Sequence, residues 1–141
     1  PSLGDDSGLE VEALDGKPGV RTARFAIAKA GQSQDEANIQ KLLEELKGVP
    51  MASRKARFVT VLALVMEGIL ITAEGILEGT IAEAPSGKNG FGYDPVFIPA
   101  GSQKTLAEIS EDEKNSISHR AKAVHSLMSK IKAKGIVFAR P

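Results

Sequence analysis

An unbroken apolar run in the middle of the chain sets the strictest limit on its fold. From Phe58 to Val65 the sequence reads Phe-Val-Thr-Val-Leu-Ala-Leu-Val, inside a longer segment from Ala56 to Met66. Successive side chains of a strand point to opposite faces, so a run that is apolar at odd and even positions suits a strand covered on both sides. We therefore expect a buried strand here.

The residues after this run predict a hairpin. Glu67-Gly68 can form a tight turn into a second strand that starts with Ile69 to Ala73 and continues toward Ala84. Gly75 and Gly79 interrupt that strand pattern and suggest a bulge or a bend.

Two capping boxes mark helix starts. Ser33 with Glu36 precedes a helical apolar pattern that ends before Gly48, and Ser110 with Glu113 precedes the final helix. An apolar stripe is expected on that final helix at Ile117, Ala121, Val124, Met128 and Ile131. With further strands at Leu9 to Leu14 and Pro95 to Pro99, these elements predict an α/β domain with a mixed β-sheet flanked by helices.

Composition narrows the function classes. The 141 residues are 42% hydrophobic, which is enough for one globular domain. Lys+Arg and Asp+Glu both number 18, so the balanced charge argues against a nucleic-acid partner. No cysteine is present, which excludes thiolate chemistry and suits a reducing cytoplasm. The longest apolar run is far too short to span a membrane.

The glycine-rich segment from Gly87 to Pro95 is the strongest candidate for a binding loop. Three glycines allow sharp turns and close approach to a ligand, while Phe91, Tyr93 and Asp94 lie among them. Rings can stack on a nucleobase, and a carboxylate can read its polar edge. The alternative is a loop whose rings cap the core.

An acidic pair lies near the start of the chain. Asp5 and Asp6 precede Ser7 and should point in opposite directions if the backbone is extended, so only one can face a given site. Such a carboxylate can bind Mg²⁺ or orient a water. The alternative is that both bond to their own turn amides.

Three cationic or titratable residues gather near the start of the final helix. Lys114, His119 and Arg120 lie where the helix dipole favours an anion. The alternative for these residues is an ordinary solvated surface.

Taken together and in order, these segments resemble the inosine/xanthosine triphosphate pyrophosphatases, the Ham1-like family. The most specific pieces are Gly-Phe-Gly-Tyr-Asp-Pro and the Lys-Asn-x-Ile-Ser-His-Arg segment that ends at Arg120. The matching segments span nearly the whole chain: 5–11, 18–20, 23–25, 56–58, 74–75, 79–81, 85–95, 104–105, 107–108 and 113–120.

The resemblance implies Mg²⁺-dependent hydrolysis of deaminated purine nucleoside triphosphates (ITP, dITP and XTP) to monophosphate and pyrophosphate. Asp6 aligns with the family's catalytic, metal-linked carboxylate, and Ser7 with a substrate-contacting residue. The residues that align with the base pocket are Phe91, Gly92, Tyr93, Asp94, Lys114, His119 and Arg120. His119 or Arg120 donors can meet the 6-oxo group of hypoxanthine or xanthine, whereas adenine would leave them unpaired. A homodimer is also implied.

One departure from the family concerns the N-terminal side. Family members begin with a strand, a Ser/Thr-x-Asn-x-x-Lys phosphate turn and a second acidic metal ligand, and none of these precedes Asp5 here. We therefore expect one domain over residues 1–141 with a two-lobed Ham1/Maf-like architecture that lacks its first strands. The alternative function is a catalytically impaired remnant that keeps a purine-binding or dimerising surface.

Overall fold

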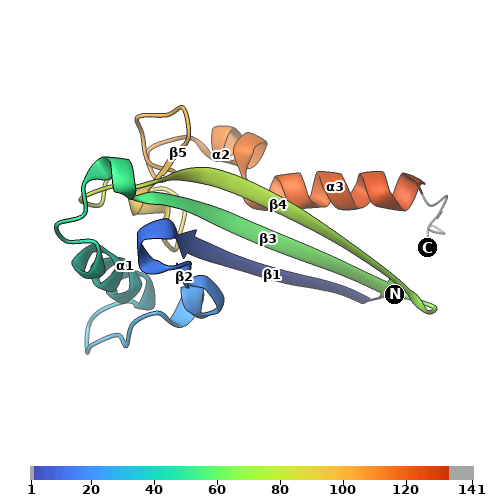
Figure 1. Ribbon diagram of the computed structural model, residues 1–141, viewed down its shortest axis with the longest axis horizontal. Coiled ribbons are helices and arrows are strands. Elements are labelled where there is room, and N and C mark those ends of the chain that lie inside the picture. The colour runs from blue at the N-terminus through green and yellow to red at the C-terminus, as the bar shows by residue number, and fades with distance from the viewer. Residues whose placement is uncertain (1, 134–141) are drawn as a thin grey trace.

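A five-stranded sheet organises the molecule. The computed structural model describes residues 2–133, and the strands follow the order β2-β1-β3-β4-β5 (Figure 1). They are β1 (Ser2–Val11), β2 (Lys17–Pro18), β3 (Lys55–Met66), β4 (Ile69–Ile81) and β5 (Phe97–Pro99). The α/β class is confirmed. A mixed sheet was expected, whereas every pairing between described strands is antiparallel.

The hairpin between β3 and β4 forms the long spine of this sheet. Its turn is Glu67-Gly68, with φ of 43° and 80°, as the sequence predicts. The register runs without a break from Lys55 opposite Thr80 to Met66 opposite Ile69. Of the bulge or bend expected at Gly75 and Gly79, the bulge is therefore absent from this pairing.

These two glycines serve close packing instead. A Cβ at Gly75 would lie 1.9 Å from the His119 carbonyl oxygen, and one at Gly79 would lie 2.3 Å from the Ile98 carbonyl oxygen. Each glycine therefore allows another segment to rest directly on the β4 backbone.

The two faces of β3 differ, which corrects the expectation of a strand covered on both sides. Phe58, Thr60 and Leu62 are buried on one face. Val61 and Val65, on the other face, are 38% and 48% exposed. Valine and alanine at the outward positions favour a strand without being buried, so a continuous apolar run does not guarantee two covering layers.

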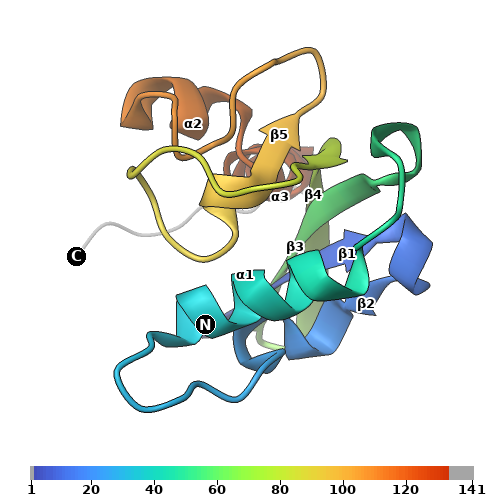
Figure 2. The ribbon, with the colours of Figure 1, turned by 90° about the vertical axis from the view of Figure 1, so that its left-hand side faces the viewer.

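Two kinds of helix surround the wide end of the sheet (Figure 2). The α-helix α1 (Gln34–Glu45) begins at Ser33, whose hydroxyl accepts a hydrogen bond from the Glu36 amide, as the capping box predicts. Short 3₁₀ helices cover Glu12–Leu14, Gly19–Arg24, Met51–Ser53 and Asp94–Val96.

The expected final helix is two helices, α2 (Glu111–Ile117) and α3 (His119–Ala133). They separate at Ser118, whose ψ of 148° is extended and whose hydroxyl accepts from the Ala121 amide. α3 runs along β4 (Figure 1) and buries Ala123, Leu127 and Ile131. The expected stripe is therefore wrong at Val124 and Met128, which are 46% and 57% exposed.

The buried side chains form two clusters on the same face of the sheet. The larger cluster lies at the wide end and includes Leu9, Phe58 and Leu77, while the smaller one includes Leu62 and Ala73 beneath α3. The row Ser7–Thr60–Gly75 crosses three strands between them. The start of α3 rests on this row, because Thr60 is bonded to His119 and Gly75 leaves room for the His119 backbone.

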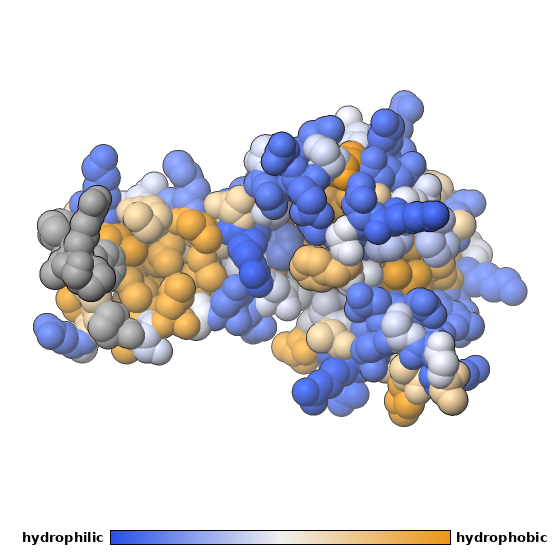
Figure 3. All heavy atoms as spheres, turned by 180° about the vertical axis from the view of Figure 1, so that it is seen from behind, coloured by the Kyte–Doolittle hydropathy of each residue, from blue (hydrophilic) through white to orange (hydrophobic). Residues whose placement is uncertain are grey.

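Apolar side chains also remain at the surface toward the hairpin tip (Figure 3). Exposed examples near this end include Leu3, Val65 and Leu70. Within the described residues, no helix is long and apolar enough to cross a membrane.

Candidate purine-binding site

The glycine-rich loop folds around the carboxylate of Asp94. Asp94 is only 5% exposed, and the Oδ2 of its carboxylate accepts a hydrogen bond of 3.0 Å from the Phe91 amide. Gly90 has a φ of 78°, and a Cβ there would lie 2.1 Å from Asp94 Oδ2. Glycine at this position is what lets the loop close over the acid.

Lys114 of α2 completes this arrangement. Its Nζ lies 2.5 Å from Asp94 Oδ2, and the two side chains are 14% and 7% exposed. The same Nζ lies 4.5 Å from the centre of the Phe91 ring. Phe91 itself is 76% exposed. The result is an open aromatic face next to a shielded ion pair, which is a surface on which a base can stack.

Tyr93 does not share this surface, which corrects the expectation that both rings of the loop are placed to stack on a base; the Tyr93 ring caps the core instead. It is 3% exposed, belongs to the larger core cluster, and donates from its hydroxyl to the Thr22 carbonyl oxygen at 2.7 Å. Burial raises the pKa of its hydroxyl, and the charge of Asp35 adds to that effect. Gly92 contributes its amide, which donates to Asp35 Oδ2 at 2.9 Å and ties the loop to α1.

His119 is the first residue of α3 and lies flat on the core. Its ring stacks on Phe58 with centroids 5.1 Å apart and planes 20° apart, and its Nδ1 is hydrogen-bonded to Thr60 Oγ1. Burial lowers the pKa of the imidazole to about 4, and the neighbouring Arg120 guanidinium acts in the same direction. Asp94, Asp5 and Lys114 are close enough to affect the same pKa. His119 is therefore neutral near pH 7 and lies near the Asp94–Lys114 pair.

β1 brings one aspartate to this face. Arg120 Nη2 lies 2.9 Å from Asp5 Oδ2, and Ser7 Oγ donates to Asp5 Oδ1 at 3.3 Å. Ser7 Oγ also lies 2.9 Å from Thr60 Oγ1. Asp5, Ser7 and Thr60 share a face because Asp5 is paired with Leu62 and Ser7 with Thr60.

Asp6 lies on the other face, as the predicted alternation of Asp5 and Asp6 requires. It is exposed and paired with Val61, which faces away from the buried clusters. β2 pairs with β1 only at Glu10 and Val11, so the stretch from Ser2 to Ser7 runs along an edge of the described sheet. Asp6 and the His119 group are thus on opposite sides of one open edge strand.

This geometry agrees with the comparisons to known proteins, in which a profile of the Ham1 family matches residues 1–130. The chain belongs to the Ham1 family. It is 49% identical over 132 residues to a dITP/XTP pyrophosphatase of Bacillus subtilis (strain 168), covering 93% of this chain and 65% of that protein. It is 52% identical over 133 residues to a dITP/XTP pyrophosphatase of Elusimicrobium minutum (strain Pei191), covering 93% and 66%.

Solved structures of Ham1 proteins share the fold. The Staphylococcus aureus Ham1 protein superimposes with a TM-score of 0.85 at 41% identity, covering 94% of this chain and 67% of that one. A Ham1 protein from Coxiella burnetii gives 0.83 at 41% identity, covering 93% and 66%. This Ham1 chain spans just under two thirds of the length of the curated relatives named above.

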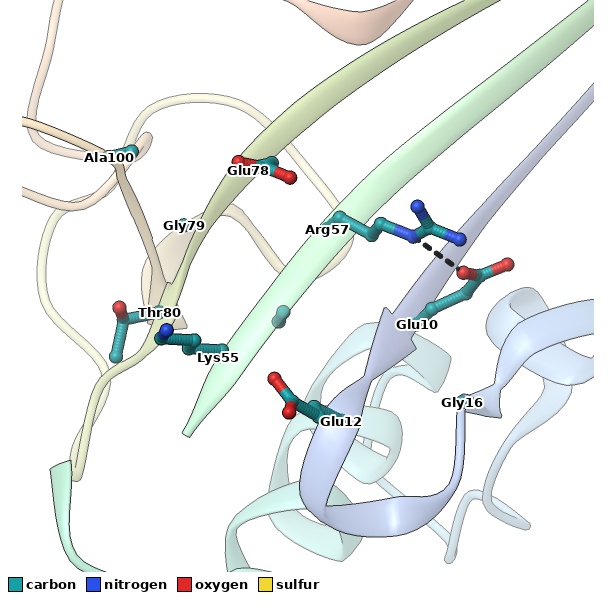
Figure 4. Close-up of a pocket in the computed structure, with 10 residues that line it drawn as sticks. Glu10, Glu12, Gly16, Lys55, Arg57, Glu78, Gly79, Thr80 and Ala100 are labelled. Atoms are coloured by element: carbon teal, nitrogen blue, oxygen red, sulfur yellow. Dashed lines mark hydrogen bonds and ion pairs between the residues drawn. The ribbon is translucent and has the colours of Figure 1, made fainter. Parts of the chain in front are cut away.

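A hollow of about 580 Å³ lies elsewhere on this Ham1 chain. Glu10, Arg57 and Glu78 line it on the face opposite the buried clusters, and Arg57 is bonded to Glu10 (Figure 4). None of the predicted site residues lines it. Its acids outnumber its bases, so it is poorly suited to a nucleotide phosphate.

Sequence reasoning missed two members of the site, Phe58 and Thr60, and gave no base-side role to Asp5. One signal could have found Thr60. It is the only polar residue in the run from Phe58 to Val65, and it occupies a buried position where an unpaired hydroxyl would be costly. A buried threonine hydroxyl in an apolar strand therefore predicts a hydrogen-bonding side chain packed on that face of the sheet.

Proposed function

We propose that this protein hydrolyses 6-oxopurine nucleoside triphosphates (ITP, dITP and XTP) to the monophosphate and pyrophosphate, with Mg²⁺ as cofactor. The relatives named dITP/XTP pyrophosphatase, which are identical to this chain at about half of the aligned positions, support the reaction. The observation that carries the proposal is the convergence of the Phe91 face, the Asp94–Lys114 pair, and the start of α3 at His119 and Arg120.

In this proposal the purine stacks on Phe91, whose ring is exposed and has the Lys114 ammonium over it. The polar edge of the base faces His119 and Arg120. The 6-oxo group accepts a hydrogen bond from the Arg120 guanidinium, whereas the 6-amino group of adenine would place a donor against a donor. That mismatch disfavours ATP.

The triphosphate then extends along the open edge of β1. Ser7 and Arg120 lie on the base side of that edge, and Asp6 lies on the far side. Mg²⁺ is commonly held by one or two carboxylates together with substrate phosphates, so a single exposed carboxylate at Asp6 suits it. No group of three or more potential ligands gathers among residues 2–133. In this proposal substrate phosphates and water contribute to the coordination beside Asp6.

The reaction needs an attacking water and a base. Water attacks the α-phosphorus, the bond from that phosphorus to the oxygen bridging the β-phosphorus breaks, and pyrophosphate leaves. Asp6 accepts the proton of the water. The bound Mg²⁺ supplies neutralisation of charge on the phosphate oxygens.

A second candidate is a purine-binding chain with little activity of its own. Its support is the coverage of the relatives, since this chain corresponds to just under two thirds of their length. Phosphoryl transfer depends on many positioned groups acting together, whereas base stacking does not. Both candidates share the same base site.

We also propose a homodimer acting in the cytoplasm. Exposed apolar side chains such as Leu3 and Leu70 support a contact surface. The lack of cysteine suits a reducing compartment.

The test is product analysis after incubation of this chain, joined to the N-terminal segment of a Ham1 relative, with ITP and Mg²⁺. The proposal expects IMP and pyrophosphate in equal amounts, and no product when Mg²⁺ is chelated. Release of single phosphates instead of pyrophosphate would contradict it. Binding of IMP without hydrolysis of ITP would favour the second candidate.

A further inference from the structure

Four side chains form a continuous hydrogen-bonded row from the edge of the sheet to α3. Asp5 Oδ1 accepts from Ser7 Oγ at 3.3 Å, Ser7 Oγ lies 2.9 Å from Thr60 Oγ1, and Thr60 Oγ1 is bonded to His119 Nδ1. Thr60 is fully buried, with an exposed fraction of 0%. Its hydroxyl is hydrogen-bonded to both Ser7 and His119 but can donate only one proton.

The carboxylate at the end of the row sets the direction of every bond in it. Asp5 is held by Arg120 at 2.9 Å, and an ionised carboxylate only accepts. A hydrogen bond to a charged acceptor is stronger than one between neutral groups, so the Ser7 proton goes to Asp5. Ser7 Oγ then accepts from Thr60, and Thr60 Oγ1 must accept from His119. The proton of the neutral imidazole is therefore on Nδ1.

The other ring nitrogen faces accessible space. Nε2 has no hydrogen-bond partner among residues 2–133. No buried side-chain nitrogen or oxygen in this part of the chain lacks a partner, so Nε2 is reachable from outside. Without a proton, it is an acceptor.

We propose that Thr60 is a positioning residue that holds His119 as the Nδ1–H tautomer, so that Nε2 accepts a hydrogen bond from an N–H on the ligand's base. This inference rests on the proposed function, because it refines how the same site reads a purine. It changes the expected role of His119 from donor to acceptor.

The consequence is a second discrimination beside that of the 6-oxo group. Hypoxanthine and xanthine carry a proton on N1, whereas N1 of adenine is a bare acceptor. An unprotonated Nε2 meets the N1–H of the oxopurines and meets a lone pair on adenine. The adjacent Arg120 guanidinium supplies the donor for O6. Arg120 then donates to O6 while His119 accepts from the neighbouring N1–H, so a donor and an acceptor on adjacent residues match two adjacent atoms of the base.

The direct test is the tautomer of His119, measured by ¹⁵N–¹H correlation spectra of protein labelled in its histidine side chains. The chain has two histidines, and the exposed His125 is an internal control. We expect His119 to show a protonated Nδ1 and an unprotonated Nε2 near pH 7, without any ligand. Protonated Nε2 in the native protein would overturn the proposal.

Variants at Thr60 separate positioning from packing. Thr60→Ser keeps the hydroxyl and should keep the tautomer, whereas Thr60→Val keeps the shape and should lose the Nδ1–H preference. The backbone amide spectrum of each variant reports whether it is folded. A folded Thr60→Val protein with an unchanged His119 tautomer would contradict the role of Thr60. If that variant did not fold, the spectrum of the native protein would still test which nitrogen of His119 carries the proton.

Binding of IMP and AMP, measured by titration calorimetry, tests the consequence. Thr60→Val should reduce the preference for IMP over AMP by about fivefold, as expected for one lost hydrogen bond, while Thr60→Ser retains it. An unchanged preference in Thr60→Val would contradict the discrimination by Nε2. If neither nucleotide bound the native protein, the proposed function would fail while the spectra still decided the tautomer.

Discussion

Asp94 and Lys114 are joined by a 2.5 Å ion pair between Oδ2 and Nζ that is almost shielded from water, although 20 positions separate them in the chain. The pair fastens the glycine-rich loop to α2 and places the Phe91 ring beside the ammonium group. Asp94 also accepts from the Phe91 amide, so the acid organises both the backbone and the charge of the loop.

Breaking this pair should therefore destabilise the protein. Lys114→Met leaves a buried carboxylate without its cation, and we expect a loss of about 3 kcal/mol in the free energy of unfolding, measured with urea. The control is Arg57→Met, which breaks the exposed pair with Glu10. That variant should change stability much less, because water screens both of its charges. Equal effects from the two variants would mean that the Asp94–Lys114 pair is not shielded.

The lowered pKa of His119 predicts a pH dependence of stability. An unfolded histidine titrates near pH 6.5, while burial and Arg120, opposed by Asp94 and Asp5, leave the folded value at about 4. Between these values the unfolded state binds more protons, so stability should fall as the pH drops from about 6.5 toward 4. His119→Gln should reduce this slope in urea unfolding measurements, and His125→Gln should not. A slope unaffected by His119→Gln would contradict the burial of the ring.

Phe91 and Tyr93 should respond differently to substitution because one ring is open and the other is in the core. Phe91→Ala should weaken IMP binding by about 1–3 kcal/mol and leave the unfolding midpoint nearly unchanged. Tyr93→Phe removes only the bond to the Thr22 carbonyl oxygen, so it should reduce stability and leave IMP affinity unchanged. If Tyr93→Phe weakened binding as much as Phe91→Ala, the second ring would belong to the site after all.

Several parts of this site could be predicted from sequence because they depend on local rules. Strand alternation separates Asp5 from Asp6, and Ser33 and Ser110 start helices as their capping boxes require. Gly90 is needed for the turn around Asp94.

Other parts depend on tertiary contacts that no local pattern contains. Tyr93 packs in the larger core cluster, where a carbonyl 71 positions away accepts the hydrogen bond of its hydroxyl. Val124 is exposed because α3 is a separate helix that begins at His119, and the face that it turns to the sheet carries Ala123 and Leu127. The motif identified His119, but its neutral state comes from burial of the ring, which stacks on Phe58, and from the neighbouring Arg120 charge.

The two aspartates of β1 offer a sharp test of roles. Asp6→Asn should abolish pyrophosphate release and leave the unfolding midpoint unchanged, because Asp6 is exposed and lies on the proposed metal side of β1. Asp5→Asn weakens the bond to Arg120, so it should mainly reduce the preference for IMP over AMP. Both variants are to be compared in this chain joined to the N-terminal segment of a Ham1 relative. Loss of turnover in Asp5→Asn alone would reverse the assignment.

That extended chain also decides the central claim, which is that this site selects 6-oxopurine triphosphates for pyrophosphate release. The measurement is kcat/KM for ITP and for ATP in Mg²⁺, with pyrophosphate as the product followed, in the extended chain and in the 141-residue chain alone. We expect the extended chain to favour ITP by roughly 100-fold or more, since a site built to pair with the base leaves polar groups unpaired with the wrong one. The 141-residue chain should turn over ITP barely or not at all. Equal rates for ITP and ATP in the extended chain would contradict the account.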